Sequence, residues 1–420
     1  MVYQFVAGRA TARPSRNAEK GRSKPMNAQD SQLAAFRAEA REWLAKNFPK
    51  SLTGKRDVLM DIAPRYPEGE DWAAWKTAMG DKGWGTPTWP TEYGAGGLSR
   101  QEAMILDDEI ERIGAFNPIV GMGVNMLGPT LLEFGTDEQR AQHLPLVVRG
   151  AVNWCQGYSE PGAGSDLASL KTKAEDKGDH YLVNGQKIWT SGSMYADWCF
   201  CLVRTSNDHK HEGISFLLID MHSPGVEVRP ITLISGKQTF AEVFFTDVKV
   251  EKGNLVGDLR QGWTIAKRLM QHERNGIGAR KVSVGELRPV HEVAKEYIGT
   301  DDQGRLSDYD LRARIARHQM WERAQRLTVA RVVEESKQGP SEATSVMKNA
   351  GSVSIQTREE LLMEIMGNRG IGWEGDDYLP VEIEQTRQML QNKANSIYGG
   401  TYEIQANIIS KRILGMLDHQ

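Results

Sequence analysis

The spacing of the apolar residues changes twice along this chain, and this change limits the possible folds more than any other feature. From Asp30 to about Gly150 the apolar residues recur every three or four positions, which is typical of helices with one buried face. From about Ala151 to Gly262 they alternate with polar residues, which is typical of strands. From Trp263 onward the helical spacing returns. The sequence therefore predicts an α+β multi-domain chain in three parts: helical, β and helical.

A chain of 420 residues exceeds one typical core, so we expect these parts to be separate domains. We place the N-terminal helical domain at 26–150, the β domain at 151–262 and the second helical domain at 263–420. Residues 1–25 carry six Lys or Arg residues and one acid. Because they have no long apolar stretch, we interpret them as a disordered extension ahead of a natural start at Met26. A transit-like or nucleic-acid-binding arm is the less favoured alternative.

The overall composition argues against several classes of partner and site. The formal net charge is −3 and 25% of the residues are charged, so the sequence predicts no nucleic-acid partner. No run approaches the roughly 18 apolar residues that a membrane-spanning helix requires, so we expect no membrane partner. Cys155, Cys199 and Cys201 are odd in number and lack the spacing of metal ligands. We therefore predict no metal site and a reduced compartment, either the cytoplasm or, if the N-terminus is a transit peptide, the mitochondrial matrix.

Local signals support the first helical part. Leu33, Phe36 and Ala40 follow one helical stripe. The segment 136–139, TDEQ, is typical of a capping box that opens a further helix. Residues 83–99, GWGTPTWPTEYGAGGLS, are too rich in Gly and Pro for regular structure. We expect this stretch to be a long ordered loop that covers another element.

The β part contains a hairpin signal and further strands. In HYLVNGQKIW, residues 180–189, Asn184-Gly185 stands between two strand-like runs, which predicts a hairpin. Residues 212–220 and 240–250 have the composition of further strands. At the far end of the predicted hairpin, Trp189 and Ser191 offer an aromatic ring and a hydroxyl that together could cover a flat ligand ring. By residue type alone, a core position is the favoured alternative for a strand Trp.

The stretch YSEPGAGSD, residues 158–166, is the most specific in the chain. Its glycines allow backbone N–H groups to approach a planar or anionic ligand, and Ser159 and Ser165 add hydroxyls. By composition, an ordinary surface turn is an equally favoured alternative. Signatures of P-loops, dinucleotide folds, zinc proteases and serine hydrolases are missing from the sequence.

Five segments, in this order, resemble segments of the acyl-CoA dehydrogenases: EFGTDEQRAQHLP, CQGYSEPGAGSDLASLKTKAE, VNGQKIWTSG, DVKVEKGNLVG and YGGTYEIQANIISKRILG. The resemblance covers nearly all of the chain after about residue 30. It implies an N-terminal helical domain, a middle β-barrel and a C-terminal four-helix bundle. It also implies one FAD per subunit and, usually, a homotetramer, with a homodimer or a heterotetramer as alternatives.

The resemblance also implies roles for individual residues. Ser159 matches the position that contacts the pyrimidine edge of the flavin, and Ser165 the position near the cofactor phosphates and the substrate. Trp189 and Ser191 match the pair that packs on the isoalloxazine ring and bonds to it. The remaining positions assigned to FAD are Gln156, Tyr158 and Gly164 in the loop, and Glu364, Gly367, Thr401 and Glu403 near the C-terminus.

Two of these positions depart from the family pattern. Tyr158 stands where a small aliphatic residue is usual, and Glu364 stands where Gln is common. An acid at residue 364 would repel a phosphate on the same side. These departures place the adenine end of the predicted FAD site in more doubt than the flavin end.

The family reaction needs a carboxylate that removes the proton α to the thioester, while flavin N5 takes the hydride from the β carbon. Many members carry this carboxylate at the position of Gly399, where the chain instead has the Gly399-Gly400 pair. Glycine is costly inside a helix, so this pair indicates either a backbone turn or a need for space. A second branch of the family carries the carboxylate on the first helix after the β domain. The sequence therefore raises the question of where this chain keeps its base.

That first helix, residues 263–280, carries an acid in an apolar stripe. Ile265, Leu269 and Glu273 lie at i, i+4 and i+8, so an acid occupies a position where an apolar residue is expected. Glu273-Arg274 matches the Glu-Arg pair of the second branch, and the resemblance therefore implies Glu273 as the base and Arg274 as a substrate-binding residue. A structural ion pair of Glu273 with Arg274 or with a neighbouring helix is the alternative.

The sequence thus predicts an FAD-dependent acyl-CoA dehydrogenase of the β-oxidation type that produces a trans-2-enoyl-CoA. Its expected partners are the acyl-CoA substrate and an electron-transfer flavoprotein. A base on this helix leaves room at the distal end of the acyl chain, so we expect a branched, long or ring-bearing acyl group. A flavin monooxygenase or oxidase of the same fold and a non-catalytic subunit of a heteromeric dehydrogenase are the alternatives.

Overall fold

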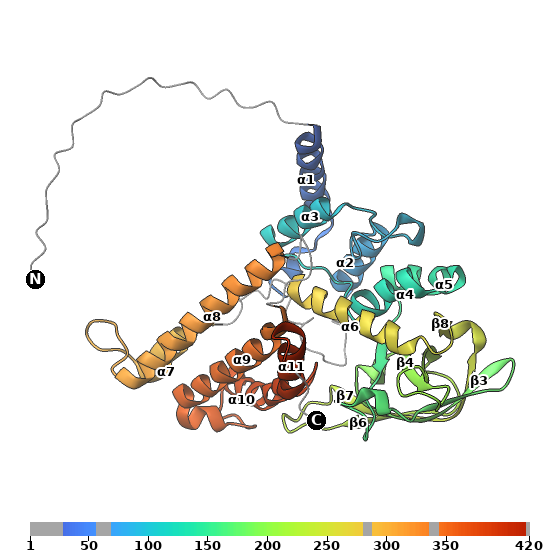
Figure 1. The fold of residues 1–420 in the computed structure, drawn as a ribbon. Helices are drawn as coiled ribbons and strands as arrows, with labels where there is room; N and C mark the ends of the chain where they lie inside the picture. The colour runs from blue at the N-terminus through green and yellow to red at the C-terminus, as the bar shows by residue number, and fades with distance from the viewer. Residues whose placement is uncertain (1–27, 56–68, 280–287, 336–343, 417–420) are drawn as a thin grey trace, which may run out of the picture.

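The computed structural model describes residues 28–55, 69–279, 288–335 and 344–416. The predicted N-terminal extension, residues 1–25, lies outside the described residues. Figure 1 shows N-terminal helices, a β-sheet and C-terminal helices, which is the order that the apolar spacing predicts. The predicted α+β class with helical, sheet and helical parts is confirmed.

The N-terminal part consists of helices that pack through aromatic side chains and one buried acid. Its elements are α1 (Ala28–Asn47), α2 (Glu70–Asp81), α3 (Arg100–Arg112), the π-helical segment Gly123–Leu127, α4 (Gly128–Phe134) and α5 (Asp137–Val148). The buried carboxylate of Glu109 on α3 binds Arg37 and Arg41 of α1 at 2.7 and 2.8 Å. This cluster joins α1 to α3, so the two helices are tied by charge as well as by apolar contact.

Two local predictions for this part are confirmed. Thr136 caps α5: its hydroxyl accepts the Gln139 backbone N–H, and the Gln139 side chain accepts the Thr136 backbone N–H. The loop 83–99 covers α4, because a Cβ on Gly128 would lie 1.9 Å from the ring of the buried Trp89. Only glycine allows this ring to lie so close to the start of the helix.

The middle part is one open sheet. Its strands are β1 (Trp154–Gly157), β2 (Lys173–Asp176), β3 (His180–Ser191), β4 (Trp198–Arg204), β5 (Ile214–Asp220), β6 (Val226–Ile231), β7 (Phe240–Glu251) and β8 (Leu255–Val256). Their order is β6-β7-β3-β2-β4-β5-β8, and β1 pairs with β4. The expected closure into a barrel is therefore wrong for the described residues. β8 contributes only two residues, which pair with β5, so this edge offers no long strand to close against β6.

The predicted hairpin at Asn184-Gly185 is also wrong. β3 runs unbroken through both residues, from His180 to Ser191. The connection to β2 lies earlier, at 177–179, because Asp176 of β2 pairs with Tyr181 of β3. The turn signal of the Asn-Gly dipeptide therefore gave way to a continuous pairing of β3 with β7.

Asn184 lies opposite a β-bulge of β7 and not in a turn. The pairing with β7 shifts between Val183 and Gly185. The Asn184 side chain donates to the Asp247 carboxylate at 3.0 Å and accepts the Asp247 backbone N–H at 2.9 Å. A Cβ on Gly185 would lie 2.5 Å from Thr172 Oγ1. The glycine therefore permits a close approach of two segments, which is a common reason for glycine inside a strand.

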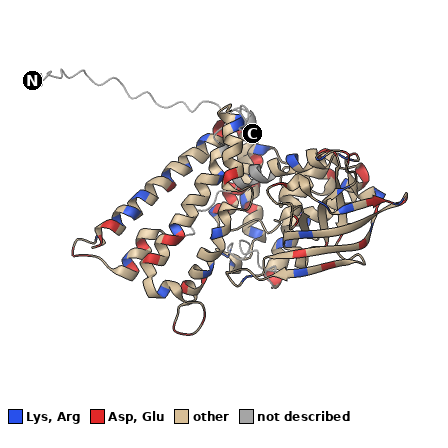
Figure 2. Ribbon diagram, turned by 60° about the horizontal axis from the view of Figure 1, so that its bottom comes forward, with Lys and Arg blue, Asp and Glu red and all other residues tan. Residues whose placement is uncertain are grey.

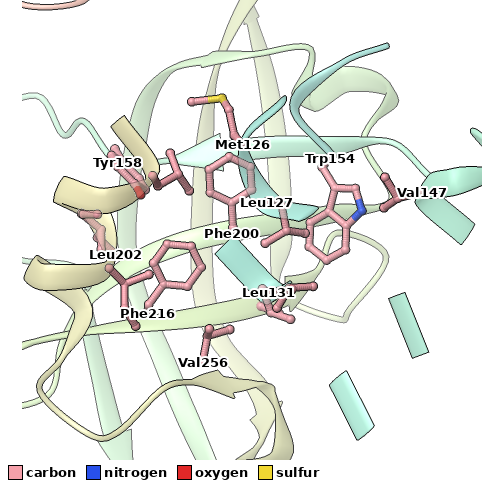
Figure 3. Close-up of a cluster of buried hydrophobic side chains, with 14 of the residues drawn as sticks. Met126, Leu127, Leu131, Val147, Trp154, Tyr158, Phe200, Leu202, Phe216 and Val256 are labelled. Atoms are coloured by element: carbon pink, nitrogen blue, oxygen red, sulfur yellow. The ribbon is translucent and has the colours of Figure 1, made fainter. Parts of the chain in front are cut away.

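Helix α6 (Gly262–Ala279) lies against the sheet and contacts the N-terminal part as well. It packs against β4, β5, α4 and the π-helical segment. Ile265, Ala266 and Leu269 are fully buried in a cluster that includes Tyr158. Figure 3 shows Tyr158 among the buried side chains of this cluster. Burial of an Ile or Leu side chain contributes about 1.5–3 kcal/mol, so this face fixes the first half of α6.

The C-terminal part is helical, as predicted. Its helices are α7 (Val290–Ile298), α8 (Tyr309–Glu335), α9 (Thr344–Met366), α10 (Pro380–Asn392) and α11 (Tyr402–Ile408). α9 packs against α7, α8, α10 and α11. Leu361, Leu362 and Ile365 of α9 are buried with apolar residues of α7 and α8. α9 therefore organises this part of the chain.

The charges and cysteines of the described residues have an ordinary distribution. Figure 2 shows acidic and basic residues interspersed along the chain. Among the described helices, none combines the length and the apolar character needed to cross a membrane. The described residues include no group of three or more His, Cys, Asp or Glu side chains that could hold a metal ion, and Cys155, Cys199 and Cys201 are buried free thiols.

Candidate active site

A buried charge pair holds the glycine-rich loop that follows β1. Lys187 on β3 donates to the Glu160 carboxylate at 2.8 Å and to the Tyr158 carbonyl at 3.2 Å. The Lys187 side chain is fully buried, and that of Glu160 is 8% exposed. The same carboxylate accepts the backbone N–H groups of Lys171 and Thr172 at 2.6 and 2.8 Å. Each charge therefore has several partners, as a charge in a dry environment requires.

These partners also set the protonation state of Glu160. Burial alone would raise the pKa of the Glu160 carboxyl, but the Lys187 ammonium and the backbone donors outweigh burial and hold the pKa below its ordinary value. Further backbone bonds shape the loop: Glu160 and Ala163 exchange N–H···O bonds at 3.1 and 3.0 Å, and Ile188 donates to the Ser159 carbonyl at 2.9 Å. The chain itself therefore fixes the conformation of the loop.

A bulge in β3 directs Trp189 outward. The pairing with β7 shifts between Lys187 and Thr190, and Trp189 has a φ angle of 59°. This left-handed conformation costs a non-glycine residue about 1–2 kcal/mol. Trp189 is 54% exposed, whereas Lys187 and Thr190 are fully buried. Strain at an exposed aromatic side chain indicates a functional position, and the ring lies edge-to-face with Phe240, with centroids 6.2 Å apart.

The other predicted residues of this region vary in exposure. We call the loop 158–166 and the β3 residues 187–191 the sheet half of the site. Gly164 and Ser165 are exposed, and Gln156, Ser159 and Ser191 are partly buried. A Cβ on Gly164 would meet nothing within 4 Å, so the backbone of the loop is open to a ligand.

Tyr158 differs from its neighbours, because its ring lies in the core. Tyr158 is 6% exposed, and its ring meets Phe200 and Phe216 edge-on, with centroids 6.1 and 6.5 Å apart. Figure 3 shows this arrangement. The predicted contact of Tyr158 with FAD can therefore involve only its backbone, and its carbonyl already accepts from Lys187.

The sheet half fits the chemistry of FAD. The cofactor combines a flat ring that has polar edges with two phosphates. The exposed indole of Trp189 can cover such a ring. The exposed Ser165 hydroxyl and the open backbone at Gly164 can bind polar edges or phosphates. The residues present are therefore suited to this cofactor.

A pocket of about 250 Å³ beside the loop has a different lining. It is lined by Glu160, Pro161, Gly162, Ser169, Lys171, Thr172, Gly185 and Gln186. It is smaller than most pockets that enclose small ligands, which measure about 300–1,000 Å³. Because Trp189 and Ser191 do not line it, we assign it no part in the site.

The predicted base lies on α6, one turn beyond a buried leucine. Leu269 is fully buried, and the helix continues through residue 273 to Ala279. Four residues advance a helix by about 6 Å along its axis. The side chains of Glu273 and Arg274 lie outside the described residues, so their roles stay predictions.

The Gly399-Gly400 pair forms a turn ahead of α11. The two φ angles are 65° and 92°, in the region that favours glycine. A Cβ on Gly399 would lie 3.6 Å from Lys348 Cε, which is an ordinary contact distance. Of the two explanations that the sequence left open, the backbone turn is the one that the structure supports.

The predicted adenine-end residues bind groups of their own chain. We call residues 364–367 and 399–403 the helical half of the site. Thr401 caps α11, because its hydroxyl accepts the Ile404 backbone N–H at 3.2 Å. Glu403 is exposed, and its own backbone N–H, together with the Thr401 hydroxyl, holds the pKa of its carboxyl below the ordinary value.

Glu364 and Gly367 lie at the end of α9. Glu364 binds Arg314 of α8 through both carboxylate oxygens, at 2.7 and 2.6 Å. Arg314 therefore neutralises the acid that the sequence analysis expects to repel a phosphate. Gly367 has a φ angle of 54° and follows the last residue of α9. The glycine permits the change of chain direction there.

Sequence reasoning missed the charge pair of Glu160 and Lys187. Both residues lie inside segments that are notable for other reasons, the glycine-rich stretch 158–166 and the Asn184-Gly185 segment. The sequence contains a signal for this pair. The alternation that places Tyr181 and Val183 on the buried face of β3 also places Lys187 there. A buried lysine needs an anionic or carbonyl partner, and this requirement points to the neighbouring loop.

Comparisons with known proteins agree with this architecture. Family models described as the N-terminal, middle and C-terminal domains of acyl-CoA dehydrogenases match residues 30–151, 155–248 and 260–414. The chain is 35% identical over 387 residues to the acyl-CoA dehydrogenase IpdE1 of Mycobacterium tuberculosis. The aligned region covers 91% of this chain and 97% of the relative.

Two solved structures have similar folds, and one of them is described as a complex. The Tcur3481-Tcur3483 steroid ACAD has a TM-score of 0.71 at 29% identity, covering 93% of this chain and 98% of that chain. The ChsE4-ChsE5 complex from Mycobacterium tuberculosis has a TM-score of 0.69 at 28% identity, covering 96% of this chain and 100% of that chain.

Proposed function

The chain belongs to the acyl-CoA dehydrogenase family, and we propose that it oxidises a bulky acyl-CoA with Glu273 as the catalytic base. As a member of this family it is an FAD-dependent oxidoreductase of lipid catabolism. The proposal adds the base, the site residues and the type of acyl group.

The observation that carries the proposal is the position of α6 against the glycine-rich loop. Ile265, Ala266 and Leu269 share a buried cluster with Tyr158, the first residue of the loop. The next position on this stripe of the helix is Glu273. An acid at the next position of a stripe whose described members are buried supports a base on this helix.

Each proposed residue has a distinct task. When bound, FAD supplies the acceptor for the hydride that leaves the β carbon of the substrate. Glu273 removes the proton from the α carbon, and exclusion of water makes its carboxylate a stronger base. Positioned proton transfer of this kind contributes roughly 10²–10⁴-fold to the rate. Arg274 and the Ser165 hydroxyl bind the thioester substrate.

The remaining residues hold the cofactor. Trp189 covers the flavin ring and Ser191 bonds to it, while Ser159 and Ser165 bind its polar edge and phosphates. Gln156, the Tyr158 backbone and Gly164 complete the sheet half, and Glu364, Gly367, Thr401 and Glu403 contribute from the helical half. Because Glu364 and Thr401 bind their own chain, a contact of either with FAD requires a change in those bonds.

We propose a branched or ring-bearing acyl group as the substrate. The Tcur3481-Tcur3483 relative is described as a steroid ACAD. In this chain the glycine turn at 399–400 adds no side-chain bulk, and Ile397, Tyr398 and Tyr402 around it are 65%, 52% and 51% exposed. Apolar surface of this size beside the turn suits a large apolar ligand.

Further parts of the proposal concern assembly and location. The ChsE4-ChsE5 complex supports a heteromeric assembly as an alternative to a homotetramer or homodimer. An electron-transfer flavoprotein is the proposed electron acceptor, and the cytoplasm is the proposed location. We also propose the domain boundaries 26–150, 151–262 and 263–420.

The test begins with the visible spectrum of the purified protein. Bound FAD should give a flavin spectrum, and anaerobic titration with a panel of acyl-CoA esters should bleach it. We expect ring-bearing or branched esters to bleach it at lower concentrations than short straight-chain esters do. A strict preference for short straight chains would contradict the proposed substrate class.

Two further outcomes would favour the alternative functions. Rapid reoxidation of the reduced flavin by air would indicate an oxidase or monooxygenase. Bound FAD that no acyl-CoA bleaches would indicate a non-catalytic subunit. Slow reoxidation in air after bleaching is the result expected for a dehydrogenase.

A further inference from the structure

We propose that the Glu160–Lys187 pair is a positioning device that holds the glycine-rich loop and Trp189 in the geometry that FAD requires. The inference rests on the proposed FAD site in the sheet half. Neither residue needs to touch the cofactor, because the pair acts through the backbone of the loop and through the bulge of β3.

The pair joins three segments of chain at one point. Lys187 donates to the Tyr158 carbonyl and to Glu160 in the loop. Glu160 in turn accepts the backbone N–H groups of Lys171 and Thr172, which lead into β2. Removal of either charge would release the loop from β3, from the approach to β2, or from both. The pair therefore determines where the loop lies on the sheet.

The same lysine stands at the start of the bulge that carries Trp189. The pairing of β3 with β7 is regular from Gly185 to Lys187 and resumes at Thr190. Trp189 lies between them with a φ angle of 59°. Because the buried amine of Lys187 is bound to the loop, the bulge has to begin beyond it, which directs Trp189 outward. One buried amine thus positions both the loop and the exposed indole.

Stability alone gives little reason for such a pair. Replacing a buried ion pair by uncharged residues of similar size is often neutral or stabilising, whereas removing one partner is strongly destabilising. A purely structural role and a positioning role therefore differ in the behaviour of the double variant. The double variant should recover fold stability in both cases, but it should recover FAD affinity only if the role is structural.

The chain offers a matched control in the N-terminal part. Glu109 is also a buried carboxylate, and it binds Arg37, Arg41 and Arg112 at 2.6–2.8 Å. Hydrogen bonds from Arg41 and its neighbours outweigh burial and lower the pKa of its carboxyl to about 2. Glu109 joins α1 to α3, and its ion pairs in the described part of the chain lie within these two helices. Glu109→Gln should therefore lower fold stability and leave FAD affinity unchanged.

The experiment compares Glu160→Gln, Lys187→Met, the double variant and Glu109→Gln with the wild type. For each apoprotein, FAD affinity is measured by titration with FAD, and stability by thermal unfolding. We expect both single variants at the pair to unfold at lower temperature and to bind FAD about 10- to 100-fold more weakly. We expect the double variant to regain its unfolding temperature but to keep the weakened FAD binding.

Glu160→Asp serves as a milder variant in case the charge-deleting variants fail to fold. It retains both charges but shortens the carboxylate side chain by one methylene, so it should fold and still bind FAD more weakly. A double variant that regains both stability and FAD affinity would overturn the proposal. So would wild-type affinity in Glu160→Asp. Wild-type protein that binds FAD but is not bleached by any acyl-CoA would count against the proposed function and leave this test valid.

Discussion

The sheet half and the helical half of the site differ in where their polar groups find partners. In the sheet half the charged groups lie beneath the surface and bind each other, as Glu160 and Lys187 do, while Trp189 and Ser165 remain exposed. In the helical half the surface groups themselves are occupied: Glu364 binds Arg314, and Thr401 caps α11. The sheet half therefore offers groups to a ligand, whereas the helical half uses them within the chain.

This difference indicates which half is prepared for the cofactor. A group that is held in place but has no committed partner can bind a ligand without losing a bond first. A group that already caps a helix or binds an arginine has to exchange one bond for another. We therefore expect substitutions in the sheet half to change FAD binding more than substitutions in the helical half. The following predictions test that contrast.

The largest effect is expected at Trp189. Stacking of a flat ring on an aromatic side chain is worth about 1–3 kcal/mol, so Trp189→Ala should weaken FAD binding roughly 10- to 100-fold. Trp321→Ala is a matched control, because Trp321 is 49% exposed and lies on α8, away from the sheet half. FAD titration of both variants would show the contrast. Equal affinity in the two variants would remove the assignment of Trp189.

Gly399→Ala should act on stability and on substrate binding. An alanine at a φ angle of 65° is strained by about 1–2 kcal/mol, so the unfolding temperature should fall. The shift of the turn should also raise the KM for acyl-CoA. Gly304→Ala provides the control, since its φ angle of 71° imposes similar strain in a loop between α7 and α8. If both variants raise KM to the same extent, the turn at residue 399 has no specific role.

Two buried carboxylates, Glu359 of the C-terminal helical part and Glu160 of the sheet half, should respond in opposite directions to pH. Burial raises the pKa of Glu359 on α9 above the ordinary value of 4.5, despite Arg358 beside it. This group stabilises the fold most when protonated, so its contribution is lost as the pH rises through the raised pKa. The pKa of Glu160 is lowered, so its contribution is present above 4.5 and lost as the pH falls. Relative to wild type, Glu359→Gln should therefore be more favourable for folding at neutral pH than in acid.

Thermal unfolding across a pH series measures how the stability of each variant, relative to wild type, changes with pH. Glu160→Gln should show the reverse pattern, with its largest deficit at neutral pH and a smaller deficit in acid. Parallel curves for the two variants would mean that the two carboxylates have similar environments, contrary to the contrast drawn here.

The smallest effect is expected at Glu364. Its ion pair with Arg314 is partly exposed, and such pairs contribute about 0–1 kcal/mol. Glu364→Gln should therefore change the unfolding temperature little and leave FAD affinity close to that of wild type. A double-variant cycle with Arg314→Gln would isolate the pair. A large loss of FAD affinity in Glu364→Gln alone would mean that Glu364 contributes more to FAD binding than expected for the helical half.

Much of the fold could be predicted from the sequence because it follows from spacing and from local signals. The stripe of Phe36 and Ala40 predicts α1, and the Thr136–Gln139 signal predicts the start of α5. The Asn184-Gly185 signal failed because tertiary contacts overrode it: Asp247 binds Asn184, and Thr172 lies against Gly185. A local turn preference is worth little when a twelve-residue strand gains a full set of pairings.

The site was predictable in its motifs and less so in its geometry. Alternation along β3 places Lys187 inward correctly, but it also places Trp189 inward. The positive φ angle at Trp189 reverses that direction, and no local sequence rule requires it. Partners such as Arg314 for Glu364 are 50 positions apart in the chain, so only the packing of α8 on α9 brings them together.

The most direct test of the account is the rate at which acyl-CoA bleaches the flavin in Glu273→Gln. The substitution keeps the size of the side chain and removes its ability to accept a proton. In anaerobic single-turnover mixing, the account predicts retained FAD and bleaching slowed by roughly 10²–10⁴-fold. A bleaching rate equal to that of wild type would contradict the assignment of the base to α6.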